Sequence, residues 1–286
     1  MQQLGDRSAG LGGSIGAPSW GVNDYFRGPP ATRIIGPMED RPRIVVTLHG
    51  PEQASREEPT WASFDGYLDA VRRAGGEPIA LDPTASAEAR EAALATMDGL
   101  LLPGGADLDP ALDGEEPHPA VAVDGARDDL ELAAWSAARE RGVPVFGVCR
   151  GFQAINVFSG GGLVQHLEGH DSPTSAPEAH PLHLDAGSRL AMILGETDPL
   201  LSTEVNSYHH QAVRPADLAP GLVASAVAPH HDGELVEALE AEDPDDWLVG
   251  VQFHPERPEF MGPEFDRLWR AFVDAARVRS GRRRRS

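Results

Sequence analysis

The 286-residue sequence contains no lysine and a single cysteine, Cys149. One cysteine excludes an intramolecular disulfide and a zinc site built on cysteines, and it suits the reducing cytoplasm. The formal net charge of −21 disfavours nucleic acid as a ligand, because phosphates would be repelled. No run of about 18 apolar residues could span a bilayer, and the chain does not start like a signal peptide. We therefore expect a cytoplasmic protein that binds neither nucleic acid nor membrane.

Length and composition favour one large domain, since 41% of the residues are hydrophobic. Residues 1–41 are rich in Gly, Ser and Pro and predict a flexible N-terminal extension. The folded domain is expected over residues 42–279, with no linker that divides it. Residues 280–286 form a basic C-terminal tail, which is more typical of a solvated chain end than of a site for an anionic partner.

Hydrophobic periodicity predicts an α/β fold that begins at Arg43. Short buried strands alternate with helices in the first half, which indicates a doubly wound, mostly parallel sheet flanked by helices. Ligands of such folds bind at the carboxyl ends of the strands. The expected strands of this half are 43–48, 78–81, 99–102 and 143–148, with helices at 61–74, 85–95, 127–141 and directly after Cys149. Additional antiparallel strands are expected at 181–185, 204–213, 222–228, 235–240 and 247–253, before a final helix at 263–278.

Cys149 lies at the junction between a predicted strand and a predicted helix. Gly147 and Gly151 stand two residues to either side, as a tight turn around an exposed nucleophile requires. The N-terminus of the following helix would stabilise negative charge on the sulfur. A lone cysteine is more often a buried structural residue. The paired glycines and the strand–turn–helix context favour a nucleophile instead.

A nucleophilic cysteine needs a base and donors for an oxyanion. His254 follows a predicted strand, and Glu256 two residues later could bond the far ring nitrogen of His254 and fix its tautomer. Oxyanion donors are expected from the backbone N–H of Arg150 and from that of Gly104 or Gly105.

Other polar residues have weaker signals. Gln153, one helical turn after Cys149, is a candidate contact for a substrate amide. The cluster at 206–211 contains Tyr208, His209 and His210; adjacent histidines can bind metal, but no carboxylate pair or cysteine near them completes a site, so we expect a wall of the substrate pocket. We therefore predict no metal and no cofactor. Solvated or capping roles are expected for the carboxylates of Asp107, Asp109, Asp128 and Asp129, and a surface turn at 230–233.

Together these motifs resemble the gamma-glutamyl-gamma-aminobutyrate hydrolase family, within the class I glutamine amidotransferase superfamily. The resemblance extends from about Arg43 to Ala276. It is carried by residues 147–153, 155–157 with 160–162, Arg127-Asp128 with Glu131, 206–212 and 250–256. Tyr208 stands where leucine is more usual in the family, and His49-Gly50-Pro51 is a less usual end to the first strand.

The resemblance implies a thiol hydrolase of polyamine catabolism with the triad Cys149, His254 and Glu256. Its substrate would be a small-molecule gamma-glutamyl amide, cleaved to glutamate and an amine through a thioester, and a homodimer is compatible with it. The alternatives are a glutaminase or glutamyl-transfer subunit that supplies ammonia to a separate synthetase, and a non-catalytic binding module that has kept the fold.

Overall fold

The structure is a computed structural model that describes residues 41–50, 64–167, 178–195 and 202–283. The predicted N-terminal extension therefore lies almost entirely outside the described residues, as do residues 61–63 of the first predicted helix. The described part of this predicted helix is α2, which spans Asp65–Arg73.

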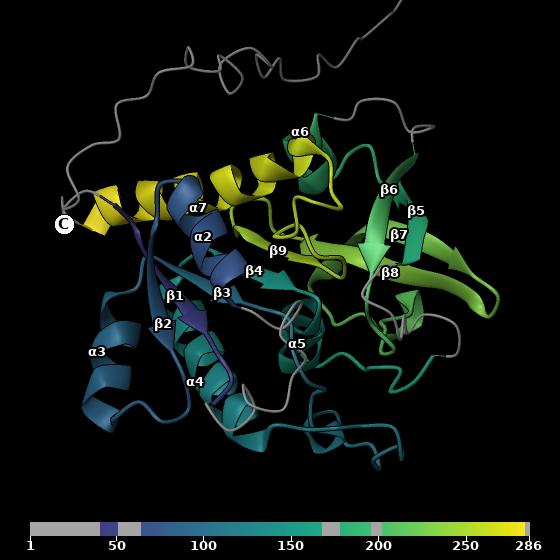
Figure 1. The fold of residues 1–286 in the computed structure, drawn as a ribbon, viewed down its shortest axis with the longest axis horizontal. Helices are drawn as coiled ribbons and strands as arrows, with labels where there is room; N and C mark the ends of the chain where they lie inside the picture. Colours follow the sequence, from purple (N-terminus) through teal and green to yellow (C-terminus); the bar gives the residue numbers. More distant parts are fainter. Residues whose placement is uncertain (1–40, 51–63, 168–177, 196–201, 284–286) are drawn as a thin grey trace, which may run out of the picture. The chain divides into compact units, whose positions relative to one another are not determined.

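Within these residues, nine strands form one mixed sheet in the order β2-β1-β3-β4-β9-β8-β7-β5-β6 (Figure 1). The five strands from β2 to β9 pair in parallel, and the remaining pairings are antiparallel. The predicted fold class is thus confirmed. The strands are β1 (Arg43–Thr47), β2 (Glu77–Leu81), β3 (Gly99–Leu102), β4 (Val145–Val148), β5 (Glu178–Leu184), β6 (Ser202–Ser207), β7 (Leu222–His230), β8 (Gly233–Ala241) and β9 (Leu248–Val251).

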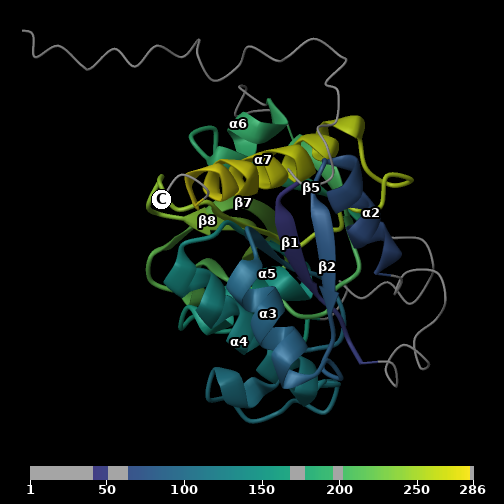
Figure 2. The ribbon, with the colours of Figure 1, turned by 90° about the vertical axis from the view of Figure 1, so that its left-hand side faces the viewer.

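Helices cover both faces of the sheet, as Figures 1 and 2 show. On one face lie α2, α6 (Arg189–Leu194) and α7 (Asp266–Arg283), whose apolar side chains join one buried cluster. On the other face, α3 (Ala87–Thr96), α4 (Gly125–Arg141) and α5 (Arg150–Phe158) contribute to a second cluster. A parallel sheet needs this double cover because both of its faces are apolar.

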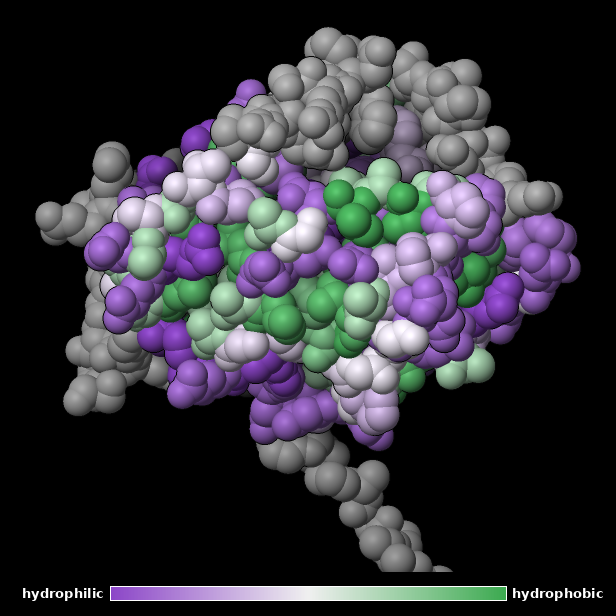
Figure 3. All heavy atoms as spheres, turned by 90° about the horizontal axis from the view of Figure 1, so that it is seen from below, coloured by the Kyte–Doolittle hydropathy of each residue, from purple (hydrophilic) through white to green (hydrophobic). Residues whose placement is uncertain are grey.

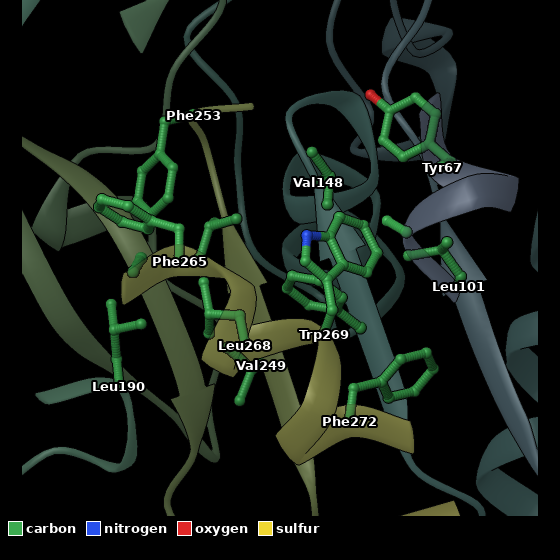
Figure 4. Packing of buried hydrophobic residues seen from close by; sticks show 14 of the residues in the cluster. Tyr67, Leu101, Val148, Leu190, Val249, Phe253, Phe265, Leu268, Trp269 and Phe272 are labelled. Atoms are coloured by element: carbon green, nitrogen blue, oxygen red, sulfur yellow. The ribbon is translucent and has the colours of Figure 1, made fainter. Parts of the chain in front are cut away.

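The first cluster is built around aromatic residues of α7 (Figure 4). Trp269 and Phe272 are almost completely buried, and both pack against Phe146 of β4 with ring centroids 5.1 and 5.7 Å apart. Burial of a large apolar side chain stabilises a fold by about 1.5–3 kcal/mol. Helix α7 therefore packs against β4, the strand that leads to Cys149.

Two predicted elements differ from the structure, and one helix was not predicted. The strand expected at 204–213 ends at Ser207, and the residues that follow form only isolated bridges at Ala212 and Val213. Helix α6 was not predicted, because its six residues are too few for a periodic signal; it is bounded by a Ser188 N-cap and by Gly195 in the left-handed conformation. Helix α7 extends to Arg283, so the first residues of the predicted tail are helical.

The face shown in Figure 3 carries hydrophilic residues around smaller apolar patches. In the part of the chain that the structure describes, no helix is both long enough and apolar enough to cross a membrane.

Candidate active site

Three neighbouring parallel strands end at the same edge of the sheet and assemble the candidate site. Strand β4 pairs with β3 on one side and with β9 on the other, with Val148 opposite Val251. The residues just beyond these strands are Gly104 after β3, Cys149 after β4 and His254 after β9. A Cβ atom added to Gly104 would lie 3.0 Å from the ring of His254 and 3.5 Å from the Cβ of Cys149. The predicted convergence of these segments is therefore present.

Cys149 occupies a strained turn at the start of α5. Its φ of 51° makes it the only non-glycine residue with positive φ in the described segments, and such strain costs about 1–3 kcal/mol. The flanking glycines allow the close approach: a Cβ on Gly151 would lie 1.9 Å from the carbonyl oxygen of Leu102, and one on Gly147 would lie 2.5 Å from that of Gly151. The turn has the strained strand-to-helix geometry that the glycine spacing predicts, although Cys149 itself is only 7% exposed.

His254 and Glu256 form a buried pair, with 2.7 Å between Nδ1 and the nearer carboxylate oxygen. Burial alone would lower the pKa of His254, but the Glu256 carboxylate and the sulfur of Cys149 outweigh burial and raise it to about 10. At neutral pH the imidazole therefore carries a proton that it can donate.

The turn containing His254 is held from two other elements. The side chain of Asn206, at the end of β6, accepts from the backbone N–H of His254 at 2.8 Å and donates to its carbonyl at 3.0 Å. The indole N–H of Trp269 donates to the carbonyl of Pro255 at 3.3 Å. Sequence analysis placed Asn206 in a cluster expected to form a wall of the substrate pocket. The spacing of Asn206 from His254 along the chain offers no signal for this contact.

Tyr67 of α2 is a site residue that sequence analysis missed. The backbone N–H of Gly104 donates to the Tyr67 hydroxyl at 3.1 Å, and the same oxygen lies 3.3 Å from Nδ1 of His254. Burial, together with the nearby Glu256 and Cys149, raises the pKa of Tyr67 well above its ordinary value. The hydroxyl therefore stays protonated and links a predicted oxyanion donor to the predicted base.

A buried ion cluster fixes the loop after β3. Arg127 donates to the carbonyls of Pro103 and Gly104, both at 2.9 Å, and to Glu131 at 2.9 Å. Gly105 has a φ of +149°, and a Cβ there would lie 2.0 Å from the Arg127 guanidinium. The cluster thus positions both glycines that were predicted as oxyanion donors.

The side chain of Arg150 belongs to this same cluster and forms buried ion pairs with Asp128 and Glu131. Burial raises the pKa of Asp128. Burial would also raise the pKa of Glu131, but Arg127 and Arg150 outweigh burial and lower it. The solvated or capping role expected for Asp128 is therefore wrong, whereas Asp109 does cap the short helix at Pro110–Leu112. The backbone N–H of Arg150 lies at the start of α5, where an oxyanion donor was expected.

Gln153 is buried, and its amide nitrogen donates to Gln211 and to Gln252 rather than pointing to a free position. Gln252 in turn donates to the sulfur of Cys149 at 3.6 Å. Gln153 thus orients Gln252, a residue of the site that sequence analysis missed, and its expected contact with substrate stays a prediction.

Tyr208, His209 and His210 are adjacent in the sequence, but their side chains contact different parts of the structure. Tyr208 packs edge-on against the ring of His254, with centroids 5.4 Å apart. His210 lies 3.0 Å from one oxygen of Asp107, a contact that was not predicted, while the other oxygen accepts from the backbone N–H of Ala122. His209 is buried beside Glu237, whose pKa burial raises to about 8.

Comparisons with known proteins show which proteins the chain is similar to. Residues 45–256 match the family described as Peptidase C26. The chain is 39% identical to the Mycobacterium tuberculosis protein named "Putative glutamine amidotransferase Rv2859c", over 76% of this chain and 68% of that one. It is 37% identical to gamma-glutamyl-gamma-aminobutyrate hydrolase PuuD of Escherichia coli K12, over 66% and 76% of the two chains. The glutaminase domain of Trypanosoma brucei CTPS has a similar fold, with a TM-score of 0.57, 20% identity, and coverage of 82% of this chain and 93% of that one.

The fold and the cysteine elbow define a domain of the class I glutamine amidotransferase type. Within that class the chain belongs to the Peptidase C26 family, together with the gamma-glutamyl-gamma-aminobutyrate hydrolases. The protein is therefore a hydrolytic enzyme.

Proposed function

We propose that the protein hydrolyses gamma-glutamyl amides, with Cys149 as nucleophile, His254 as acid and base, and Glu256 as the group that orients His254. The observation that carries the proposal is the strained turn of Cys149 beside a His254–Glu256 pair in which the imidazole is protonated at neutral pH. A protonated imidazole beside the sulfur supports a reactive thiolate.

In the first half of the reaction, the sulfur of Cys149 attacks the side-chain carbonyl carbon and the carbon–nitrogen bond breaks. His254 gives its proton to the leaving amine, and a glutamyl thioester remains on Cys149. In the second half, His254 takes a proton from water, the resulting hydroxide attacks the thioester, and glutamate leaves with the thiolate restored.

Backbone N–H groups would stabilise the negative charge that develops on the carbonyl oxygen. The N–H of Arg150 and that of Gly104 are the candidates. The N–H of Gly104 donates to the hydroxyl of Tyr67, so the substrate oxygen would take the place of that hydroxyl during the reaction.

The E. coli relative supports a substituted gamma-glutamyl amide as substrate. Tyr208, which departs from the leucine more usual in that family, packs against His254 and would line the amine half of the pocket. The M. tuberculosis relative, named as a putative glutamine amidotransferase, supports glutamine itself as a second candidate substrate, with ammonia passed to a separate synthetase. The cytoplasmic location, the homodimer and the place in polyamine catabolism stay predictions.

Glutamate release from gamma-glutamyl-GABA, gamma-glutamyl-polyamines, a gamma-glutamyl anilide and glutamine would separate these candidates. We expect turnover of the substituted amides well above that of glutamine, lost by several orders of magnitude in Cys149→Ser. Mass spectrometry of the quenched wild type should detect a glutamyl adduct on the peptide that contains Cys149.

Turnover of glutamine alone would favour the ammonia-supplying reaction. Full activity in Cys149→Ser would overturn the mechanism. If the folded wild type released no glutamate from any of these substrates, the non-catalytic binding module would be supported.

A further inference from the structure

We propose that His180, His209 and Glu237 form a binding site for a divalent transition-metal ion, with Zn²⁺ as the best fit. His180 lies on β5, His209 follows β6, and Glu237 lies on β8, so the group belongs to the antiparallel half of the sheet. One ligand atom from each residue can be chosen such that all three lie within 4.8 Å of one another.

The distances within the group fit a shared ion better than direct hydrogen bonds. Nε2 of His180 and Nε2 of His209 each lie 3.7 Å from an oxygen of Glu237. Hydrogen bonds between nitrogen and oxygen span about 2.7–3.2 Å. Zinc bonds of about 2.0–2.2 Å at tetrahedral angles place neighbouring ligand atoms about 3.4 Å apart. The two histidine nitrogens face different oxygens of Glu237, at separations too long for hydrogen bonds and close to those between two ligands of one ion.

The carboxylate of Glu237 accepts no hydrogen bond from the residues that the structure describes. Its side chain is 0% exposed. Moving a carboxylate out of water is costly unless a proton, a cation or hydrogen bonds compensate it. A divalent ion supplies that compensation.

Both histidines are oriented as metal ligands usually are. Nδ1 of His209 lies 2.8 Å from the carbonyl oxygen of Gln211, and Nδ1 of His180 lies 3.3 Å from that of Pro181. A carbonyl oxygen only accepts, so each Nδ1 carries the proton and a neutral ring presents the lone pair of Nε2. Such backbone contacts fix the tautomer of metal-bound histidines.

Two imidazoles and one carboxylate suit zinc and related first-row ions, and they leave a fourth position for water. The ion would tie β5, the segment after β6 and β8 together. Its effect would reach the active site, because the carbonyl of Glu237 accepts from the backbone N–H of Gln252 at 2.8 Å and the side chain of Gln252 contacts Cys149. We assign the ion a positioning role on this side of the pocket.

The test is binding of Zn²⁺ and Co²⁺ to the tag-free full chain after treatment with a chelator. We expect one tightly bound ion per chain by elemental analysis, a rise in Tm with Zn²⁺, and visible Co²⁺ absorption bands typical of low coordination numbers. Glu237→Gln and His209→Asn should each lower the affinity at least tenfold and remove the Co²⁺ bands.

The surface group of His230, His231 and Asp232 could also hold an ion and provides the control. His231→Asn should leave the tight site unchanged. Loss of the bound ion in His231→Asn alone, or equal binding by the wild type and Glu237→Gln, would overturn the proposal.

Partly exposed His180 gives a variant that is expected to fold even if the buried substitutions do not, since 16% of its side chain is accessible. Unchanged affinity in folded His180→Asn would also overturn the proposal. All measurements can be repeated in Cys149→Ser, because metal binding does not depend on hydrolysis.

Discussion

In the parallel half of the sheet the proposed catalytic side chains lie just beyond the ends of strands, whereas in the antiparallel half two of the proposed metal ligands lie within strands. Cys149 and His254 follow β4 and β9, while His180 and Glu237 lie inside β5 and β8. Parallel neighbours all end at one edge, so a short motif after each strand is enough to build a site there. In the antiparallel half, two side chains become neighbours through strand pairing between residues that are distant in the sequence, so no local motif predicts the contact.

The largest effect should follow from removing the base in the parallel half. His254→Ala is expected to lower kcat/KM for the preferred gamma-glutamyl amide by several orders of magnitude, because both proton transfers are lost. His231→Ala, in the exposed turn between β7 and β8, should stay within twofold of the wild type. Comparable losses in the two variants would mean that the chemistry is not confined to the parallel half.

The elbow should be intolerant of a single added methyl group. Gly151→Ala is expected to lower the free energy of unfolding by about 3 kcal/mol, because its Cβ would overlap the carbonyl oxygen of Leu102. Urea unfolding measures this loss. Gly125→Ala, where nothing lies within 4 Å of an added Cβ, should change the free energy of unfolding by less than about 0.5 kcal/mol. Equal stability of the two variants would contradict the close packing of the turn.

Glu256→Gln should lower kcat/KM by about 10²-fold, less than His254→Ala, since the imidazole remains but loses its orienting carboxylate. It should also change how stability depends on pH. The folded-state pKa of His254, about 10, lies above the ordinary value of 6.5. Protonation of His254 therefore stabilises the folded protein fully below about pH 6.5, and this stabilisation is lost as pH rises toward 10. The free energy of unfolding falls by up to about 1.4 kcal/mol per pH unit in this range.

Unfolding of Cys149→Ser between pH 6 and 10, with and without Glu256→Gln, isolates this effect from the thiol. We expect the slope to be shallower in the double variant. The same slope in both proteins would show that Glu256 does not hold the proton on His254.

The smallest expected effect tests a contact that joins the two halves. Asn206→Ala, at the end of β6, should lower kcat about tenfold and the free energy of unfolding by about 2 kcal/mol, because the backbone N–H and carbonyl of His254 lose their partner. Exposed Glu204→Ala on the same strand is the matched control. An unaffected kcat in Asn206→Ala would show that the antiparallel half does not position the base.

Sequence-based prediction succeeded where the signal was a local motif and failed where a contact joins distant residues. Cys149 and the pair His254–Glu256 could be predicted to lie at one site because glycine spacing and a two-residue separation are local signals. Tyr67 and His254 are 187 residues apart, and Asn206 and His254 are 48 apart, so neither contact leaves a pattern in the chain. The assignment of Asp128 failed for a related reason: its partner Arg150 lies on another helix, 22 residues away.

The sequence by itself determined the α/β alternation, the family and the residues that follow the central strands, because hydrophobic period, glycine steric demands and short motifs are encoded in neighbouring residues. Only the tertiary structure decided that Tyr67 bonds Gly104, that Arg127 and Arg150 hold the loop and the elbow, and that Glu237 lies beside His180 and His209. These contacts depend on strand order, register and burial, which arise when distant segments pack together.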